Sequence, residues 1–359
     1  MENEEKNTQK AEETVKNEEQ IKADKEAFEE ALYAAPDEDD EEEAEKPKKK
    51  KKGRYGPISI ILLVICAGVF VYSMTNILKL TPNDFSTKSI IDELKQEGLK
   101  YDEEYSYIYN DIDNPEQHAD DPNDPSSQGQ DKKKTAKLVL DETDGSISFL
   151  ARPLSATKNS RNADITAWLF FPDVAGAVSP GLTIDTAVVK YKDNDYYLSH
   201  DLEKKENENG WIFFDSNCDG TYLANNRNTI LYGHARSDNM FGGLKYLNEK
   251  PKWYENKSNH YIRIQTESQD TIWQIFAWYE TNVDDEVASG YNYITKKFPS
   301  DEYYVEFLNR LQSKNMIDSF TRFEFDADDK ILTLSTCKTY DKAIRVVIHA
   351  KLVKLRIWE

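Results

Sequence analysis

Cys337 is one of only three cysteines in the 359-residue chain, and its surroundings suit nucleophilic chemistry. It ends a β-type run, "ILTLSTC", and Arg345 follows eight residues later in a second such run. A guanidinium beside a thiol favours the nucleophilic thiolate, and it can also donate hydrogen bonds to an oxyanion. The stretch therefore suggests a cysteine nucleophile assisted by an arginine. The alternative for Arg345 is a solvated surface side chain.

If residues 331–337 form a strand, the alternation of its side chains predicts which of them face the same way as Cys337. Successive side chains of a strand point to opposite faces, so Leu334 lies on one face while Ser335 and Cys337 flank it on the other. The leucine face is predicted to be core, and the opposite face is predicted to line a groove. The connection "KTYD" is short enough to join neighbouring antiparallel strands, so we expect Arg345 to lie close to Cys337.

A cysteine nucleophile also needs a group that donates and accepts protons, most often histidine. His118 lies in a polar linker, His200 in "YLSHD", which is predicted to be a loop, and His260 at the start of a predicted strand after a polar turn. His349 belongs to the same β-type run as the arginine. His234 ends "NTILYGH", ahead of a polar loop, and catalytic groups are commonly displayed where strands open into loops. His234 is therefore favoured, and His349 remains the alternative.

An uncharged stretch of 21 residues, "ISIILLVICAGVFVYSMTNIL", occupies residues 58–78. As a helix it would span ~31 Å, about the thickness of a bilayer core. The basic run at 46–54 precedes it, which predicts a cytoplasmic N-terminus and an extracellular remainder. An uncleaved anchor is favoured over a buried core helix. It is also favoured over a cleaved signal peptide, because a signal peptide needs a short basic leading segment, whereas residues 1–56, with nineteen acidic side chains, precede this stretch.

The net charge of −20 is concentrated outside the part of the chain that looks globular. Residues 1–45 hold nineteen acidic residues against five lysines, and residues 101–131 hold ten acidic residues and no basic ones. The low pI therefore says little about the partners of the folded part. The predicted organisation is a disordered charged cytoplasmic tail (1–56), a transmembrane anchor (57–79), a juxtamembrane helix and acidic linker (80–135), and a catalytic domain (136–359).

Short β-branched and aromatic runs separated by turn-rich pieces fill the chain from about residue 160, which predicts an all-β barrel or sandwich. One helix, at 299–317, is expected to interrupt them, with Ser300 as its N-cap and an apolar stripe that includes Tyr304 and Leu311. The juxtamembrane segment 84–108 is also predicted to be helical, with Ile90, Leu94 and Leu99 forming an incomplete apolar stripe. The eight β-type runs are "ADITAWLFFP", "TIDTAVVKY", "GWIFFD", "NTILYGH", "HYIRIQT", "DTIWQIFAWYE", "KILTLSTC" and "AIRVVIHAKLVKLRIWE".

Cys218 offers two alternatives to a catalytic interpretation. An extracellular domain permits disulfides, so a Cys218–Cys337 bridge is the structural alternative for the candidate nucleophile. Cys218 also lies in "DSNCDG", which imitates the start of a calcium-binding loop. The twelfth position of that loop is Asn226 rather than glutamate, and the flanking sequences resemble strands. We therefore predict a turn without calcium.

The motifs together resemble those of sortases, the cysteine transpeptidases of Gram-positive cell surfaces. "TLSTC" followed by a strand arginine resembles the family's TLxTC…R signature, and "NTILYGHARSDNMFGGL" resembles its histidine segment. "KDNDYYLSHD", "NADITAWLFFP" and the helix at 299–317 resemble class B members in particular. The resemblance covers residues 160–359. Lys338 departs from the acidic residue that often follows the cysteine, and His349 occupies a usually apolar strand position.

The resemblance implies a closed, mainly β barrel of about eight strands with N-terminal helices and one added helix before the cysteine strand. It implies a nucleophile at Cys337, a proton-handling histidine at His234 and an oxyanion-stabilising arginine at Arg345. Substrate contacts are implied at Asn194, Leu198 and Ser335. No cofactor or metal is expected.

Such an enzyme would cleave a sorting-signal peptide after threonine and transfer the acyl group to an amine. The expected partners are surface proteins or pilins that carry sorting signals, a peptidoglycan or pilin amine, and the membrane through a single span. No nucleic acid is expected. A hydrolytic cysteine endopeptidase and a non-enzymatic surface protein with a Cys218–Cys337 disulfide remain the alternatives.

Overall fold

The computed structural model describes residues 65–70, 73, 82–101, 136–143, 145, 147–172, 184–235, 240–289, 292–337 and 343–358. None of the helices in these ranges is both long enough and apolar enough to cross a bilayer. Most of the predicted anchor at 57–79 lies outside the described residues. The predicted cytoplasmic tail (1–56) and the acidic segment 109–135 lie entirely outside them.

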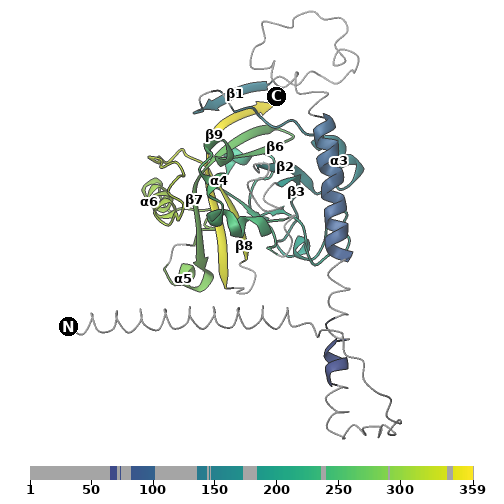
Figure 1. Cartoon of the computed structure of the whole chain (residues 1–359). Coiled ribbons are helices and arrows are strands. Elements are labelled where there is room, and N and C mark those ends of the chain that lie inside the picture. The colour runs from purple at the N-terminus through teal and green to yellow at the C-terminus, as the bar shows by residue number, and fades with distance from the viewer. Residues whose placement is uncertain are drawn as a thin grey trace, which may run out of the picture. The chain divides into compact units, whose positions relative to one another are not determined.

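All eight β-type runs of the sequence are strands in the structure, and one strand that was not predicted, β1, precedes them (Figure 1). The strands are β1 Ala136–Asp141, β2 Ile165–Phe171, β3 Ile184–Val189, β4 Phe213–Phe214, β5 Asn228–Tyr232, β6 Tyr261–Thr266, β7 Gln269–Asn282, β8 Ile331–Cys337 and β9 Ile344–Trp358. Besides the helix over residues 82–101, the α-helices of the described residues from 136 onward are α3 Leu154–Ser160, α4 Pro251–Tyr254, α5 Val283–Ala288 and α6 Asp301–Ser313. The 3₁₀ helices are η2 Tyr196–Leu198, η3 Leu223–Asn225, η4 Gly242–Glu249 and η5 Lys257–His260.

The sheet closes on itself. Its strand order is β1-β9-β7-β6-β2-β3-β4-β5-β8, and β8 pairs again with β9, so β2 to β9 form a closed barrel of eight strands. The long strand β9 makes closure possible, because its first half pairs with β8 and its last residues pair with β1. The closed barrel confirms the mainly β prediction and excludes the sandwich.

Large aromatic side chains fill the barrel core. Trp168, Trp211, Trp273 and Trp278 are all fully buried. Their polar N–H groups are satisfied inside the core, as when the Trp278 indole donates to the Leu244 carbonyl at 2.9 Å. Aromatic burial of this kind contributes a large share of the apolar stabilisation of a domain.

Helix α6 lies between β7 and β8 in the chain and packs on the outside of the barrel (Figure 1). The Ser300 side chain accepts a hydrogen bond from the Tyr303 amide and caps the helix, as predicted. The predicted apolar stripe is buried against Phe276 on β7 and Val347 on β9, in a cluster separate from the barrel core. The members of the stripe are Tyr304, Phe307, Leu308 and Leu311.

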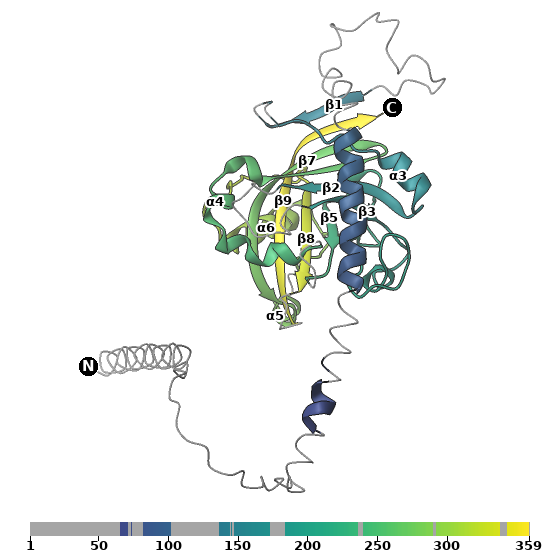
Figure 2. The ribbon, with the colours of Figure 1, turned by 45° about the vertical axis from the view of Figure 1, so that its right-hand side comes forward.

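The helix over residues 82–101 runs along the β2–β3 side of the barrel (Figures 1 and 2). Ile90 and Leu94 belong to the barrel core cluster, and Leu94 is fully buried. Leu99, the third member of the predicted stripe, is 57% exposed, so that part of the prediction is wrong. The contact face follows Thr87, Ile90, Ile91 and Leu94, a spacing of three and four residues that keeps them on one side.

Polar contacts fix this helix to the loop that follows η2. The Asn209 side-chain amide donates to the Asp84 carboxylate at 2.7 Å, and the Asn207 amide donates to the Thr87 hydroxyl at 3.0 Å. Thr87, Asn207 and Asn209 are buried, so water competes less for these hydrogen bonds. The loop between η2 and β4 is therefore held from outside the barrel as well as from within.

Candidate active site

Strand pairing brings Cys337 and Arg345 together. Strands β8 and β9 are antiparallel, and Cys337 and Arg345 are the final register partners of the pair. The pair Ser335–Val347 lies two residues away from them on both strands. Ser335 and Cys337 therefore share a face of β8. The predicted proximity of the thiol and the guanidinium is thus a consequence of the register.

His234 reaches the same place through a parallel pairing. Strand β5 runs parallel to β8, and Tyr232 is the register partner of Ser335. His234 lies two residues after Tyr232, just beyond the end of β5, and Cys337 lies two residues after Ser335 on β8. Because the two segments run in the same direction, the two side chains lie at about the same level. The Gly233 amide, which donates to the Ser335 carbonyl at 3.4 Å, continues the contact between the two segments.

The orientation of His234 is set by a backbone carbonyl. Its Nε2 lies 2.8 Å from the carbonyl oxygen of Leu198, so in the tautomer protonated at Nε2 it donates to that oxygen. Gly210 packs directly against this contact with a positive φ of 58°. A Cβ at Gly210 would lie 2.3 Å from the Tyr197 carbonyl oxygen and 3.1 Å from Cδ2 of His234, so only glycine fits there.

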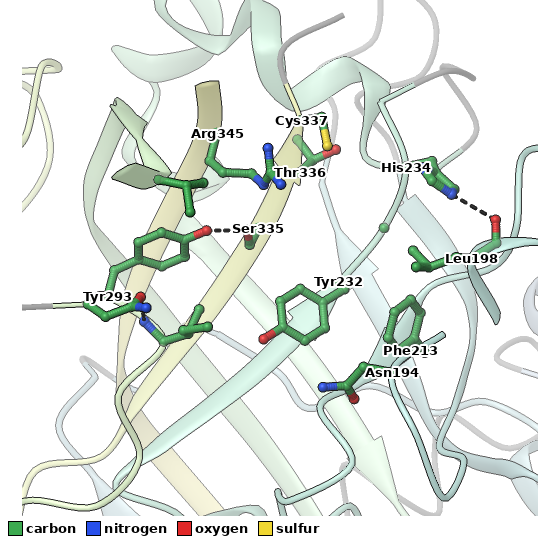
Figure 3. A pocket seen from close by; sticks show the side chains of 14 residues that line it. Asn194, Leu198, Phe213, Tyr232, His234, Tyr293, Ser335, Thr336, Cys337 and Arg345 are labelled. Atoms are coloured by element: carbon green, nitrogen blue, oxygen red, sulfur yellow. Dashed lines mark hydrogen bonds between the residues drawn. The ribbon is translucent and has the colours of Figure 1, made fainter. Parts of the chain in front are cut away.

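One pocket of about 320 Å³ contains all six residues that the sequence singled out for chemistry or substrate binding. In Figure 3 the Cys337 side chain is seen between those of Arg345 and His234. Among the lining residues that the structure describes, Arg345 is the only permanently charged side chain. The lining residues are Asn194, Leu198, Phe213, Tyr232, Gly233, His234, Val283, Asn292, Tyr293, Ile294, Ser335, Thr336, Cys337 and Arg345.

Tyr232 and Tyr293 form aromatic walls of this pocket that the sequence did not predict (Figure 3). Tyr232 could have been found, because it precedes His234 by two residues in the β-type run "NTILYGH", in which alternate residues are predicted to share a face. No local pattern marks Tyr293, which lies in the connection between α5 and α6. Its hydroxyl is 3.0 Å from the Ser335 hydroxyl, and burial raises its pKa although Ser335 and Arg345 act in the opposite direction.

Asn194 is less available to a ligand than the sequence suggested. Its side-chain oxygen accepts from the Ser216 amide at 2.7 Å, and its amide nitrogen donates to the Asp215 carboxylate at 3.3 Å. Leu198 is 39% exposed and offers its side chain to the pocket. Ser335 contributes a hydroxyl that is already bonded to Tyr293.

The disulfide alternative is wrong, because Cys66, Cys218 and Cys337 are all free thiols. Cys218 is 3% exposed and lies in the turn after β4. Burial raises the pKa of Cys218 to about 11, so this thiol stays protonated at neutral pH. Cys337 is the partly exposed thiol of the pocket.

His349, the alternative proton carrier, lies outside the pocket lining. It is fully buried, with Nε2 2.9 Å from the Tyr279 hydroxyl and Nδ1 2.9 Å from the Thr333 hydroxyl. Burial and the charge of Lys314 lower the pKa of His349 to about 3, so the imidazole is neutral. The unusual strand histidine is therefore a structural hydrogen-bonding group.

His200 and His260 do not line the pocket, and each makes other contacts. His200 stacks on Tyr196 with ring centroids 4.0 Å apart, and His260 is buried with Nε2 2.7 Å from the Tyr254 carbonyl oxygen. His118 lies outside the described residues.

The calcium-like sequence at 215–220 is a turn, as predicted. The Asp219 carboxylate accepts from the Thr221 and Tyr222 amides at 2.9 Å each, and from the Asn225 side chain at 2.9 Å. These donors leave the carboxylate satisfied without a cation. Within the described residues, no group of three or more histidine, cysteine or acidic side chains is arranged to hold a metal.

A closed barrel that gathers a cysteine, a histidine and an arginine in one pocket has the composition of a cysteine-dependent acyl-transfer enzyme. Residues 180–353 match the family model described as the sortase domain. Sortase B of Listeria monocytogenes is 32% identical over 196 residues, which are 54% of this chain and 71% of that protein. Sortase B of Staphylococcus aureus is 32% identical over 213 residues, which are 57% and 76% of the two chains.

The X-ray structure of Clostridium perfringens sortase B is 31% identical and covers 55% of this chain and 98% of that one, with a TM-score of 0.45. The chain belongs to the sortase family. It is a class B sortase, a cysteine transpeptidase, and the resemblance carried by "TLSTC", "LYGH" and the strand arginine is confirmed.

Proposed function

We propose that this sortase cleaves a sorting-signal peptide after threonine, holds the acyl group as a thioester on Cys337, and transfers it to an amine of peptidoglycan or a pilin subunit. The observation that carries the proposal is the meeting of Cys337, His234 and Arg345 in one pocket, each placed by strand pairing. A nucleophile, a proton carrier and an oxyanion donor are the groups that covalent acyl transfer requires.

The first half-reaction forms the thioester. The Cys337 sulfur attacks the threonine carbonyl carbon, and the Arg345 guanidinium donates hydrogen bonds to the resulting oxyanion. When the C–N bond breaks, His234 gives a proton to the departing amine. The products are an acyl-enzyme and a released C-terminal peptide.

The second half-reaction exchanges sulfur for nitrogen. The acceptor amine attacks the thioester carbonyl, and His234 takes the proton that the amine loses. The carbon–sulfur bond breaks and the Cys337 thiolate leaves. One amide bond is consumed and one is made, so the cycle needs neither an oxidant nor a nucleotide.

The remaining lining residues are suited to a largely uncharged peptide segment. The described lining has no carboxylate, and Phe213, Tyr232, Tyr293 and Ile294 supply apolar surface. We assign substrate contact to Leu198 and Ser335, and a contribution through shape to Asn194, because both polar atoms of its side chain are already bonded.

The sequence also supports a membrane-anchored arrangement. The uncharged stretch at 58–78 is long enough for a single span, and the basic run at 46–54 favours a cytoplasmic N-terminus. The catalytic domain would then face the cell wall, where sorting-signal proteins and amine acceptors are found.

The test is a peptide-cleavage assay with full-length protein in detergent and a panel of threonine-containing peptides. Cys337→Ala should abolish cleavage, whereas Cys218→Ala should retain it because that thiol lies in the turn after β4. Full activity in Cys337→Ala would refute the assignment. Addition of an acceptor amine should yield an amide product by mass spectrometry, and release of only the free acid would indicate a hydrolytic endopeptidase instead.

A further inference from the structure

Asp215 follows β4 directly and is the first residue of the calcium-like sequence. Its side chain is 2% exposed and does not line the pocket. A single oxygen, Oδ2, accepts from three side chains: Lys296 Nζ at 2.9 Å, the Tyr232 hydroxyl at 3.0 Å and Asn194 Nδ2 at 3.3 Å. The other oxygen accepts from the Asn217 amide at 2.9 Å.

The three side-chain donors come from three separate sections of the pocket wall. Asn194 lies in the connection after β3, and Tyr232 is the last residue of β5. Lys296 follows the segment 292–294, all of whose residues line the pocket. Segments separated by up to about a hundred residues are thus joined at one atom of one buried carboxylate.

The electrostatics keep this junction intact. Burial would raise the pKa of the Asp215 carboxyl, but the Lys296 ammonium and the Asn217 amide hold it below its usual value. Burial and the nearby Asp215 charge raise the pKa of Tyr232, so its phenol remains a proton donor. A buried charge that lost its partners would be strongly unfavourable, so the three donors are held firmly.

We infer that Asp215 is a positioning residue that fixes three sections of the pocket wall against one another, and that peptide binding depends on it. The inference rests on the proposed function, because it takes the pocket to be the peptide site. Asp215 acts through Asn194, Tyr232 and Lys296 and contacts neither the peptide nor the thiol. Walls held in their binding conformation lower the ordering cost that a ligand must overcome.

Cys337 and Arg345 do not depend on this junction, because the β8–β9 register places them. Loss of the carboxylate should therefore weaken peptide binding and leave the reactivity of the thiol intact. That separation distinguishes a positioning role from a general loss of structure, which would affect both.

The experiment compares full-length Asp215→Asn with wild type in steady-state peptide cleavage and in alkylation of the protein by iodoacetamide. Removal of a charged hydrogen-bond acceptor should raise KM by about tenfold while kcat changes by less than about threefold. The alkylation rate of Cys337 should stay within about twofold of wild type. Asp219→Asn is the matched control, since its carboxylate lies in the same turn and accepts from Thr221, Tyr222 and Asn225, which do not line the pocket.

Lys296→Met gives a second route if Asp215→Asn fails to fold, because it removes one donor and keeps the carboxylate. It should raise KM in the same direction. In the double variant its effect should largely disappear, since both changes break one interaction. Unchanged KM in both single variants, or equal losses of kcat and thiol reactivity without a rise in KM, would overturn the inference.

A crystal structure of Asp215→Asn separates this inference from the proposed function. If wild type cleaves no peptide, the proposed function fails, and the structure alone decides the role of Asp215. We expect Asn194 and the segment 292–296 to shift relative to β8. A pocket wall that superimposes on that of wild type would contradict the positioning role.

Discussion

Cys337 and Arg345 face each other as the last register partners of the antiparallel pair β8–β9. Their separation of eight residues in the chain is what a short connection between two such strands requires. Arg345 thus enters the pocket of Cys337 from the neighbouring strand, so its position is set by the backbone of the barrel. An arginine placed in this way has a fixed direction as well as a charge.

Arg345→Ala should lower kcat/KM for peptide cleavage by about 10²- to 10³-fold, because a hydrogen-bond donor to the oxyanion is lost. Arg345→Lys should recover only part of this loss, since an ammonium keeps the charge but lacks the planar pair of donors. Arg322→Ala, an exposed arginine outside the pocket, should leave kcat/KM unchanged. Equal activity of the lysine variant and wild type would show that charge alone suffices.

Gly210→Ala should reduce activity through the orientation of His234. The added Cβ would press on the Tyr197 carbonyl and on the His234 ring, so the contact between His234 and the Leu198 carbonyl would shift. Gly145→Ala is a matched control, because Gly145 also has a positive φ, of 79°, but no atom within 4 Å of its Cβ position.

Both variants carry the backbone cost of about 1 kcal/mol for a non-glycine residue at positive φ. Only Gly210→Ala should also lower kcat, measured by peptide cleavage. A comparable loss of kcat in Gly145→Ala would show that backbone strain alone explains the effect.

His349 should make folding stability depend on pH below about 6.5, the usual pKa of an unfolded-state histidine. Its folded pKa is lowered to about 3, so the unfolded chain gains a proton that the folded chain does not accept. Stability is therefore lost as pH falls from 6.5 towards 3. The loss approaches about 1.4 kcal/mol per pH unit for this group.

Urea unfolding at pH 7.5 and pH 5 measures this contribution. The wild-type free energy of unfolding should fall by about 2 kcal/mol more than that of His349→Gln over this range. His260, whose pKa burial also lowers, adds a slope of the same sign in both proteins. Parallel pH curves for the two proteins would show that His349 is not held neutral.

Leu94→Ala should destabilise the protein by about 2–5 kcal/mol, because a fully buried leucine would leave a cavity between the helix over residues 82–101 and the barrel core. Leu99→Ala, on the same helix but 57% exposed, should change stability by less than about 0.5 kcal/mol. The free energy of unfolding in urea measures both. Similar small effects would indicate that the helix is not part of the cooperative unit.

Local patterns were sufficient to predict eight of the nine described strands and the α6 cap, and to single out three side chains that line one pocket. Period-two alternation around Cys337 and the run ending at His234 are properties of short segments, and the residues themselves carry them. The packing of α6 followed from its apolar spacing. Leu99 shows the limit of such patterns, because whether a stripe is buried depends on how far the partner surface extends.

The contacts that complete the site could not be predicted in this way. Tyr293 reaches Ser335 from a segment 42 residues earlier in the chain, and Lys296 reaches Asp215 across 81 residues. Such pairs depend on the closure of the barrel and leave no periodic signal. The sequence around Asp215 predicts only a turn, because the partners of its carboxylate are distant in the chain.

The pairing of β8 with both β5 and β9 has a consequence for how activity appears during folding. Strand β9 carries Arg345, and strand β5 ends two residues before His234. The β5–β8 contact joins segments about a hundred residues apart. Contacts between such distant segments require the slow closure of a long loop. Before β5 and β8 have paired, the three residues lie apart, so a partly folded molecule is inactive. Recovery of peptide cleavage after dilution from denaturant therefore reports the closure of the barrel.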